Sequence, residues 1–482
     1  MERVISVQYP ALFDDGRSDN KAGEPEGVTI GEIDGRVYAF VGLERAGTTV
    51  VFDVTDPLTV TYTGVAQRPG DENPEGTLFI SAADSPTGSA LYVSANESSN
   101  NISVFEASPT FKLQLLHFAD GEAGLLAGQT APNLAALVDA FEDDFANTLI
   151  LAGGDNFIPG PFLAAGTDAS VAATHDKGNN PGAADIEIHN RIGVEASTVG
   201  NHEFDLGTNA FSDAINDAAF PYLSANLDFS ADGALVGRFQ ETVGVGGLED
   251  AASPARKIVP SAVVNEGGQL IGLVGATTQI VEAISSTGGV EVKGFAGDGS
   301  EANDMALLAA QLQIVIDDLH DQGVNQIILM AHLQQIACEV ALAPRLEGVD
   351  IILAAGSNTR LGDADDVAVA FPGHAADFAG SYPIVTAGAD GDTTLIVNTD
   401  NEYTYLGRLV VEFDSEGRII PGSLDESING ATAATDANVA AAWGVDEADL
   451  ATTAFADGTK GAAVKQITDA VDAVITAKDG EV

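Results

Sequence analysis

The amino-acid sequence predicts a layered α/β domain that follows an all-β segment. Between about residues 109 and 423, buried apolar strands alternate with stretches of helical periodicity, and polar residues follow the end of nearly every strand. Residues 1–108 instead contain short β-rich runs separated by turns. After residue 423 the composition shifts to Ala, Asp and Thr. We therefore expect three parts, with boundaries near residues 108 and 423.

Length and composition narrow the class of protein. A chain of 482 residues is too long for one ordinary core, so at least two domains are expected. No apolar run approaches the roughly 18 residues of a membrane span, and no basic-then-apolar leader opens the chain, so we expect neither a membrane segment nor a signal peptide. The single cysteine, Cys338, excludes an internal disulfide framework and thiolate-based zinc clusters.

The chain is strongly acidic. It carries 72 acidic against 20 basic residues, a formal net charge of -52. Nucleic acids are bound through Lys and Arg, so this charge argues against nucleic-acid binding and equally against anionic membrane surfaces. Because 45% of the residues are hydrophobic, we expect a folded protein with an acidic surface and a saline source, where salt screens the repulsion.

Residues 1–108 contain an internal repeat. Glu24–Gly27 reads Glu-Pro-Glu-Gly and Asn73–Gly76 reads Asn-Pro-Glu-Gly, and each is followed by a Tyr-containing strand and a Val-Phe strand. The prolines of the two copies are 49 residues apart, close to the period of a β-propeller blade. We therefore expect about two blades, which cannot close a ring.

The runs Phe40–Arg45 and Asp53–Pro57 resemble the last blades of a propeller-like domain that precedes phosphoesterase modules in some large secreted bacterial proteins. By this resemblance residues 1–6 would lie inside a blade. The alternative is an independent small β-domain. In both cases we expect a docking or carbohydrate-facing module without catalysis.

The middle part repeats a strand, a polar turn and a helix. Strands are expected at Phe111–Phe118, Thr148–Ala152, Gly193–Val199, Phe220–Asn226, Gln269–Gly275, Gln326–His332, Val349–Leu353 and Tyr405–Asp414, and helices at Thr130–Phe145, Asp185–Arg191 and Ala302–Gln322. In the last part, we expect a loosely packed connector over 424–460 and a helix over 461–478.

The stretch Val199–Gly207 combines an amide, an imidazole and carboxylates between two glycines. The amide oxygen of Asn201 can bind a metal ion, His202 can transfer a proton, and Asp205 can orient the imidazole. An alternative is a capped helix start with Asn201 as the N-cap, which leaves the histidine unexplained.

The run Gly200–Gly207, GNHEFDLG, resembles a motif of the metallophosphoesterases of the 5'-nucleotidase type. Further blocks of that pattern follow the family order, at Leu115–Gly124, Ala152–Gly160, Ile327–Leu333 and Asp350–Leu361. The resemblance implies a four-layer αββα sandwich, metal-dependent hydrolysis of small phosphate esters, above all 5'-nucleotides, and an extracellular, periplasmic or cell-surface location. The alternative is a non-catalytic metal-binding module of a larger secreted surface protein.

The resemblance also implies the site residues. Asp120, Glu122 and Asp155 would bind a first ion, Asn201 and His332 a second, and His202 with Asp205 would form a catalytic dyad. Asn358 is a further candidate ligand of the first ion. Asn156 and Arg360 are candidate phosphate contacts.

Two departures from the family pattern alter the expected metal site. Asp120-Gly121-Glu122 replaces Asp-x-His, and Ala355-Gly356-Ser357 replaces Gly-His-Ser, so Gly356 supplies no side-chain ligand. Oxygen donors favour Mn²⁺, Mg²⁺ or Ca²⁺ over Zn²⁺, and we expect two such ions. A remaining alternative is that Glu122 only caps a helix and a single ion binds. The family's C-terminal substrate domain is expected to be absent.

Overall fold

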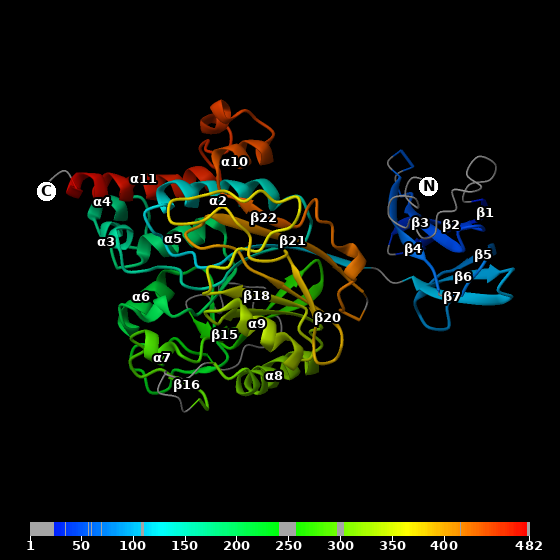
Figure 1. Cartoon of the computed structure of the whole chain (residues 1–482), viewed down its shortest axis with the longest axis horizontal. Coiled ribbons are helices and arrows are strands. Elements are labelled where there is room, and N and C mark those ends of the chain that lie inside the picture. The colour runs from blue at the N-terminus through cyan, green and yellow to red at the C-terminus, as the bar shows by residue number, and fades with distance from the viewer. Residues whose placement is uncertain are drawn as a thin grey trace. The chain divides into compact units, whose positions relative to one another are not determined.

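The computed structural model describes residues 24–33, 35–55, 57–58, 60–68, 70–107, 110–240, 257–295, 303–414 and 416–479. The chain forms two compact units, Met1–Thr110 and Phe111–Val482 (Figure 1). Residues 1–6, expected inside a blade, and residue 108, at the expected boundary, lie outside the described residues.

The N-terminal unit is built from antiparallel strands in two sheets. One sheet contains β1 (Pro25–Ile33), β2 (Arg36–Leu43), β3 (Thr48–Asp53) and β4 (Thr61–Ala66), and the other contains β5 (Pro74–Ile80), β6 (Ala90–Asn96) and β7 (Asn101–Ala107). The predicted all-β segment is confirmed. Its described strands form no closed ring, so the propeller stays a prediction.

The sequence repeat returns as a structural repeat. The β1–β2 pairing shifts register at Pro25–Gly27, and the β5–β6 pairing shifts at Pro74–Gly76. A β-bulge at the same place in both copies bends the start of each strand. The Phe40 ring of β2 stacks on Tyr92 of β6 with ring centroids 4.7 Å apart, which joins the two sheets through an apolar contact.

The main unit contains two larger sheets. The first has the order β13-β11-β10-β9-β8-β21-β22 and the second β14-β15-β17-β18-β20-β19. The first comprises β8 (Phe111–Phe118), β9 (Thr148–Ala152), β10 (Ala196–Thr198), β11 (Tyr222–Leu223), β13 (Ile258–Val259), β21 (Tyr405–Phe413) and β22 (Gly430–Ala433). The second comprises β14 (Ser261–Glu266), β15 (Gln269–Thr277), β17 (Gln326–His332), β18 (Ile351–Ala355), β19 (Ile384–Ala387) and β20 (Thr393–Val397).

Alternating side chains along the strands define the layers. Leu113 and Leu115 of β8 join a buried cluster with Met330 of β17, so this cluster lies between the two sheets. Leu116 and Phe118 of β8 belong to a different buried cluster, which contains the apolar side chains of the helices on the outer face. Strand β8 is therefore buried on both sides.

Helices cover the two outer faces. Helices α2 (Ala127–Phe141), α5 (Ala183–Ile192), α6 (Thr208–Asp217) and α11 (Lys460–Asp479) pack on the first sheet, and α8 (Met305–Asp321) and α9 (Ile336–Leu342) pack on the second. Figure 1 shows α2 beside α11 on one side of the main unit, and α8 with α9 on the opposite side. The predicted four-layer αββα sandwich is confirmed.

Shorter elements connect these layers. They are α3 (Pro161–Gly166), α4 (Ala169–Ala172), α7 (Val281–Ile284), α10 (Asp436–Trp443), β12 (Leu227–Asp228), β16 (Glu291–Val292) and the 3₁₀ turns η3 (His202–Phe204), η4 (Ala343–Arg345), η5 (Pro421–Ser423) and η6 (Glu447–Thr452). Within the described residues, no helix has both the length and the apolar character that a membrane crossing requires.

The segment after residue 423 differs from the expected loose connector. Strand β22 adds an antiparallel edge to β21, and Trp443 of α10 donates a hydrogen bond to the Ala136 carbonyl oxygen over 2.9 Å. Helix α11 buries Val464, Ile467 and Val471. The segment therefore contains regular elements that pack on the main unit, where a loosely packed connector was expected, and it includes the expected terminal helix.

Candidate functional site

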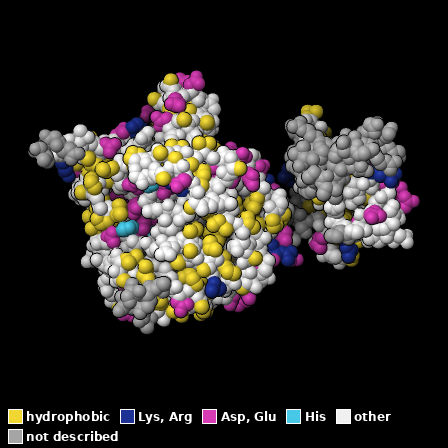
Figure 2. Space-filling model, in the orientation of Figure 1, with side chains coloured by type: hydrophobic (Ala, Val, Ile, Leu, Met, Phe, Trp, Pro, Cys, Tyr) yellow, Lys and Arg dark blue, Asp and Glu magenta, His cyan; other side chains and the backbone are white. Residues whose placement is uncertain are grey.

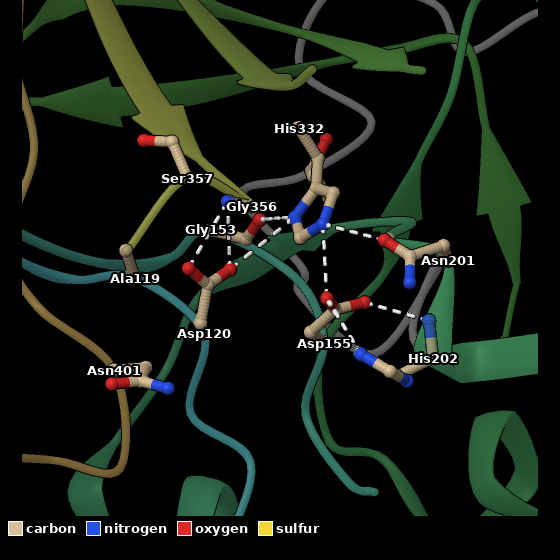
Figure 3. A network of polar contacts seen from close by, with 12 residues as sticks. Ala119, Asp120, Gly153, Asp155, Asn201, His202, His332, Gly356, Ser357 and Asn401 are labelled. Atoms are coloured by element: carbon tan, nitrogen blue, oxygen red, sulfur yellow. Dashed lines mark hydrogen bonds and ion pairs between the residues drawn. The ribbon is translucent and has the colours of Figure 1, made fainter. Parts of the chain in front are cut away.

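Five chain segments meet at the carboxyl ends of parallel strands (Figure 3). Asp120 follows β8, Asp155 follows β9, Asn201 follows β10, His332 ends β17 and Gly356 follows β18. Strands of both sheets thus contribute to one site. Ligands of α/β proteins bind at this edge, because the loops there are free to carry polar side chains.

The two aspartates sit in strained turns. Asp120 has a φ of 43° and Asp155 a φ of 49°, a region that residues other than glycine rarely adopt. Such conformations cluster at functional sites, where the surrounding structure holds them. A Cβ on Gly200 would lie 2.1 Å from Asp155 Oδ1, so only glycine permits the close approach of these two turns.

The imidazole of His332 lies at the centre of the buried group. Its Nε2 is 3.0 Å from Asp155 Oδ2 and 3.2 Å from Asn201 Oδ1. Its Nδ1 is 2.9 Å from the Gly153 carbonyl oxygen and 3.6 Å from Asp120 Oδ1. The ring is fully buried. The fold therefore brings three of the other predicted site residues, Asp120, Asp155 and Asn201, around His332.

Glu122 faces His202 on the other side of Asp155. Glu122 Oε2 is 3.8 Å from His202 Nε2, and this nitrogen is 4.0 Å from Asp155 Oδ2. Asn401 donates to Glu122 Oε1 over 3.2 Å, whereas Glu122 Oε2 is buried without a hydrogen-bond partner in the described part of the chain. A buried carboxylate oxygen in this situation requires a proton or a cation.

His202 and Asp205 form a hydrogen-bonded pair. His202 Nδ1 lies 2.6 Å from Asp205 Oδ2, and the Ser285 hydroxyl donates to Asp205 Oδ1 over 2.7 Å. Asp205 is therefore held from two sides. The His202 side chain is 29% exposed, so its Nε2 edge is accessible from solvent while its Nδ1 edge is fixed.

The pKa values follow from this crowding of buried charges. Burial raises the pKa of Asp120 to about 6, and burial with the charge of Asp155 raises that of Glu122 to about 8. Burial alone would lower the pKa of His332, but the carboxylates of Asp155 and Asp120 raise it to about 10. The excess of carboxylates therefore favours the protonated, positively charged form of His332.

The residues present fit divalent metal ions. Asp120, Asp155 and His332 each offer a donor atom within 4.8 Å of the others, and so do Glu122, Asp155 and His202. Asp155 belongs to both groups, which suits a carboxylate shared by two ions. Carboxylate, amide and imidazole donors together with the orphaned Glu122 oxygen match the ligand chemistry of Mn²⁺, Mg²⁺ and Zn²⁺.

Sequence reasoning missed the role of Glu203. Its carboxylate is fully buried and accepts hydrogen bonds from the backbone N–H groups of Asp155, Asn156 and Gly200, at 3.0, 2.8 and 2.8 Å. Burial raises its pKa to about 7. Glu203 therefore joins the turn after β9 to the turn after β10. A carboxylate that stands between His202 and Asp205 in the same short motif is the pattern that could have indicated this role.

Asn156 does not face the proposed substrate. It is fully buried, and its Nδ2 donates to Ser197 Oγ and to the Tyr222 hydroxyl, both over 2.9 Å. Ser197 Oγ in turn donates to Asn156 Oδ1 over 3.2 Å. With its amide engaged inside the fold, Asn156 is structural, which corrects the predicted phosphate contact.

The side chain of Arg360 is also engaged by other residues of the fold. It is buried, its Nη2 lies 3.1 Å from Asp400 Oδ2, and its guanidinium lies 4.9 Å from the centre of the Tyr405 ring. His374 pairs with Asp400 and Glu402, each over 2.9 Å. The predicted phosphate clamp is therefore corrected to a structural ion pair, because a buried guanidinium already neutralised by a carboxylate has little to offer a phosphate.

The predicted block Asp350–Leu361 contributes a backbone N–H group to the site. The N–H of Gly356 donates to Asp120 Oδ1 over 2.8 Å, which fixes the carboxylate. Asn358 is exposed and has a φ of 47°, and its side chain makes no hydrogen bond to the described residues. Its part in metal binding stays a prediction.

Comparisons with known proteins agree with this geometry. The chain is 31% identical to the 5'-nucleotidase of Mus musculus over 232 residues, covering 48% of this chain and 34% of that protein. Its fold is similar to that of the 5'-nucleotidase precursor from Thermus thermophilus, with a TM-score of 0.54, 24% identity and coverage of 76% of this chain and 59% of that one. Over part of its length the chain is thus similar in sequence to 5'-nucleotidases, and its fold is similar to that of a 5'-nucleotidase precursor.

The similarity covers only part of each relative. The probable 5'-nucleotidase of Treponema pallidum is 28% identical over 325 residues, which are 64% of this chain and 46% of that protein. The chain spans about a third to about half of the length of these curated relatives. Residues 1–57, in the N-terminal unit, match the model of the choice-of-anchor I domain family.

Proposed function

We propose that the metallophosphoesterase domain hydrolyses small phosphate esters, above all 5'-nucleotides. The observation that carries the proposal is the convergence of Asp120, Asp155, Asn201 and His332 at the strand ends, beside the His202–Asp205 pair. The names of the relatives, which are 5'-nucleotidases, support the choice of substrate class. An extracellular, periplasmic or cell-surface location is part of the same proposal.

Two divalent ions would be held by residues on both sides of Asp155. As the family resemblance implies, Asp120, Glu122 and Asp155 would hold the first ion. Asp155, Asn201 and His332 would hold the second, since His332 Nε2 lies 3.0 Å from Asp155 Oδ2 and 3.2 Å from Asn201 Oδ1. Such a pair of ions supplies a hydroxide nucleophile at neutral pH and neutralises phosphoryl charge. Glu122 in place of histidine makes the first site rich in oxygen donors, so Mn²⁺ or Mg²⁺ is favoured over Zn²⁺.

The chain itself would supply the proton. His202 presents its Nε2 edge toward the metal cluster, 3.8 Å from Glu122 Oε2, while Asp205 holds Nδ1 and so determines the tautomer. Burial lowers the pKa of His202, but Asp155 and the hydrogen bond with Asp205 raise it above its ordinary value. A protonated imidazole in this place can donate to the leaving oxygen of an ester.

The experiment is a turnover assay on chelator-treated protein reloaded with Mn²⁺, Mg²⁺ or Zn²⁺. The substrates are p-nitrophenyl phosphate, a nucleoside 5'-monophosphate and the matched 3'-monophosphate, and the control is the Asp155→Asn variant. We expect metal-dependent release of phosphate, fastest from the 5'-monophosphate, and no release by the variant. Protein that binds ions stoichiometrically without turning over any substrate would favour the alternative of a non-catalytic metal-binding module.

A further inference from the structure

We propose that the side-chain amide of Gln334 is a ligand of the second metal ion, in the position that Gly356 leaves without a side chain. The inference rests on the two-ion site proposed above and assigns a residue to it that no motif indicates. Gln334 lies two residues after His332, just beyond the end of β17, and its side chain is partly buried.

The backbone of Gln334 is bent toward the site. Its φ is 70°, in the left-handed region that is costly for a residue with a Cβ. Asp120, Asp155 and Asn358, which are proposed or candidate ligands, share this feature, and so do Glu402 and Tyr403 in the segment before β21. A glutamine held in such a conformation is consistent with a role for its side chain, because strain of this kind persists where the surroundings impose it.

The amide lies among the proposed ligands of the second ion. Gln334 Nε2 is 3.1 Å from His332 Nε2 and also contacts Asn201 Oδ1. His332 Nε2 is in turn 3.2 Å from Asn201 Oδ1 and 3.0 Å from Asp155 Oδ2. Neighbouring ligands at about 2.1 Å from an octahedral ion lie about 3.0 Å apart. The separations measured here match the edges of one coordination shell.

The amide also fills the space that Gly356 leaves open. A Cβ on Gly356 would lie 2.7 Å from Gln334 Nε2 and 2.7 Å from His332 Nε2. Gln334 therefore cannot keep its present conformer if residue 356 has a side chain. The family pattern has histidine at this position, and here the glutamine amide occupies its place.

A half-turn of the amide supplies an oxygen donor. The nitrogen and oxygen ends of a glutamine amide have nearly the same shape, so the group can exchange them without moving its neighbours. The nitrogen faces Asn201 Oδ1 in the structure. With an ion between the two side chains, both amide oxygens would face the ion. The second site would then have a carboxylate, an imidazole and two amides as donors.

The competing role for Gln334 is that it only positions Asn201 by donating a hydrogen bond. Two substitutions separate the roles, because alanine removes both functions while the carboxylate of Gln334→Glu can bind an ion but cannot donate a hydrogen bond. Both variants keep a Cβ and thus the same backbone strain. The neighbouring Gln335→Ala is the matched control, since Gln335 is exposed and makes no side-chain cap to α9.

The measurement is calorimetric titration of chelator-treated protein with Mn²⁺, with bound metal counted by elemental analysis and folding checked by melting of the metal-free forms. We expect two ions in the wild type and in Gln335→Ala, a second-site affinity at least about tenfold weaker in Gln334→Ala, and recovery of that affinity in Gln334→Glu. Unchanged binding by Gln334→Ala, or failure of the glutamate to restore it, would overturn the assignment of Gln334 alone. A wild type that binds fewer than two ions would overturn both this inference and the proposed two-ion site.

Discussion

His332 and His202 both lie near the carboxylate of Asp155, but their surroundings differ. His332 Nε2 lies 3.0 Å and His202 Nε2 lies 4.0 Å from Asp155 Oδ2, yet the His332 side chain is fully buried and that of His202 is 29% exposed. Both nitrogens of His332 face oxygen atoms of the interior. The nature of the surroundings, rather than the residue type, therefore separates a proposed metal ligand from a proposed proton donor.

The pairing partners extend this contrast. Asp205 holds one edge of His202 and is itself held by Ser285, so the imidazole is oriented but able to reach a substrate. His332 instead lies against the Gly153 carbonyl and has no route to solvent through its side chain. The following predictions test this division of labour, beginning with the largest expected effect.

The partly exposed His202 should be needed for turnover but not for metal binding. We expect His202→Ala to lower kcat by about 10² to 10⁴ while bound metal is unchanged, because the imidazole donates a proton and is not a ligand. The measurement is steady-state kinetics with elemental analysis of the same samples. Asp205→Asn serves as a milder companion, and loss of an ion from His202→Ala would contradict the division.

The proposed ligands should prefer harder ions. With a single buried imidazole and several oxygen donors, Mn²⁺ or Mg²⁺ should restore the activity of chelator-treated protein better than Zn²⁺, by about tenfold at equal occupancy. Phosphate release after reloading with each ion measures this. Two zinc ions bound tightly per chain with full activity would contradict the expected preference for harder ions.

The buried side of the site should make stability depend on pH. In metal-free protein His332 has a pKa of about 10 and Glu122 one of about 8, against ordinary values of 6.5 and 4.5, so the folded state binds more protons than the unfolded state. The contribution of each group to the free energy of unfolding is complete when the pH is below the ordinary pKa of that group. It is lost as the pH rises toward about 8 for Glu122 and about 10 for His332.

Bound ions replace these protons, so metal-loaded protein should not show the same loss. We expect the difference in melting temperature between loaded and metal-free protein to grow from pH 6.5 to pH 9. Thermal melting at matched ionic strength measures it. In a His332→Gln variant the difference should grow less, and a difference that shrinks with pH would refute the assignment.

Salt should act on the surface and not on the site. Figure 2 shows Asp and Glu side chains spread over the visible face of the main unit, in keeping with a net charge of -52. Raising salt to about 1 M shortens the Debye length to about 3 Å, so the melting temperature should rise by a few degrees as the repulsion is screened. Metal content should stay constant, since the buried group is shielded from salt. A melting temperature that falls over this range would contradict the expected effect.

The sequence by itself determined the chemistry at the strand ends. Apolar runs that end in polar residues, with glycine between them after β9 and β10, predicted where β8, β9, β10 and β17 end, and the αββα sandwich is confirmed. Asn201, His202 and Asp205 lie within one short motif, so local spacing was enough to predict that they act near one another. Such features depend on neighbours in the chain.

Only the tertiary structure decided which side chains face the site. Asn156 and Arg360 lie within predicted blocks, but packing turns both side chains into the interior. Gln334 belongs to no motif that the sequence analysis identified. With its left-handed backbone, its amide nonetheless lies where a side chain on Gly356 would begin. The direction of a side chain at a strand end depends on turn geometry and on segments far away in the chain, because those segments supply the partners that compensate backbone strain and buried charge.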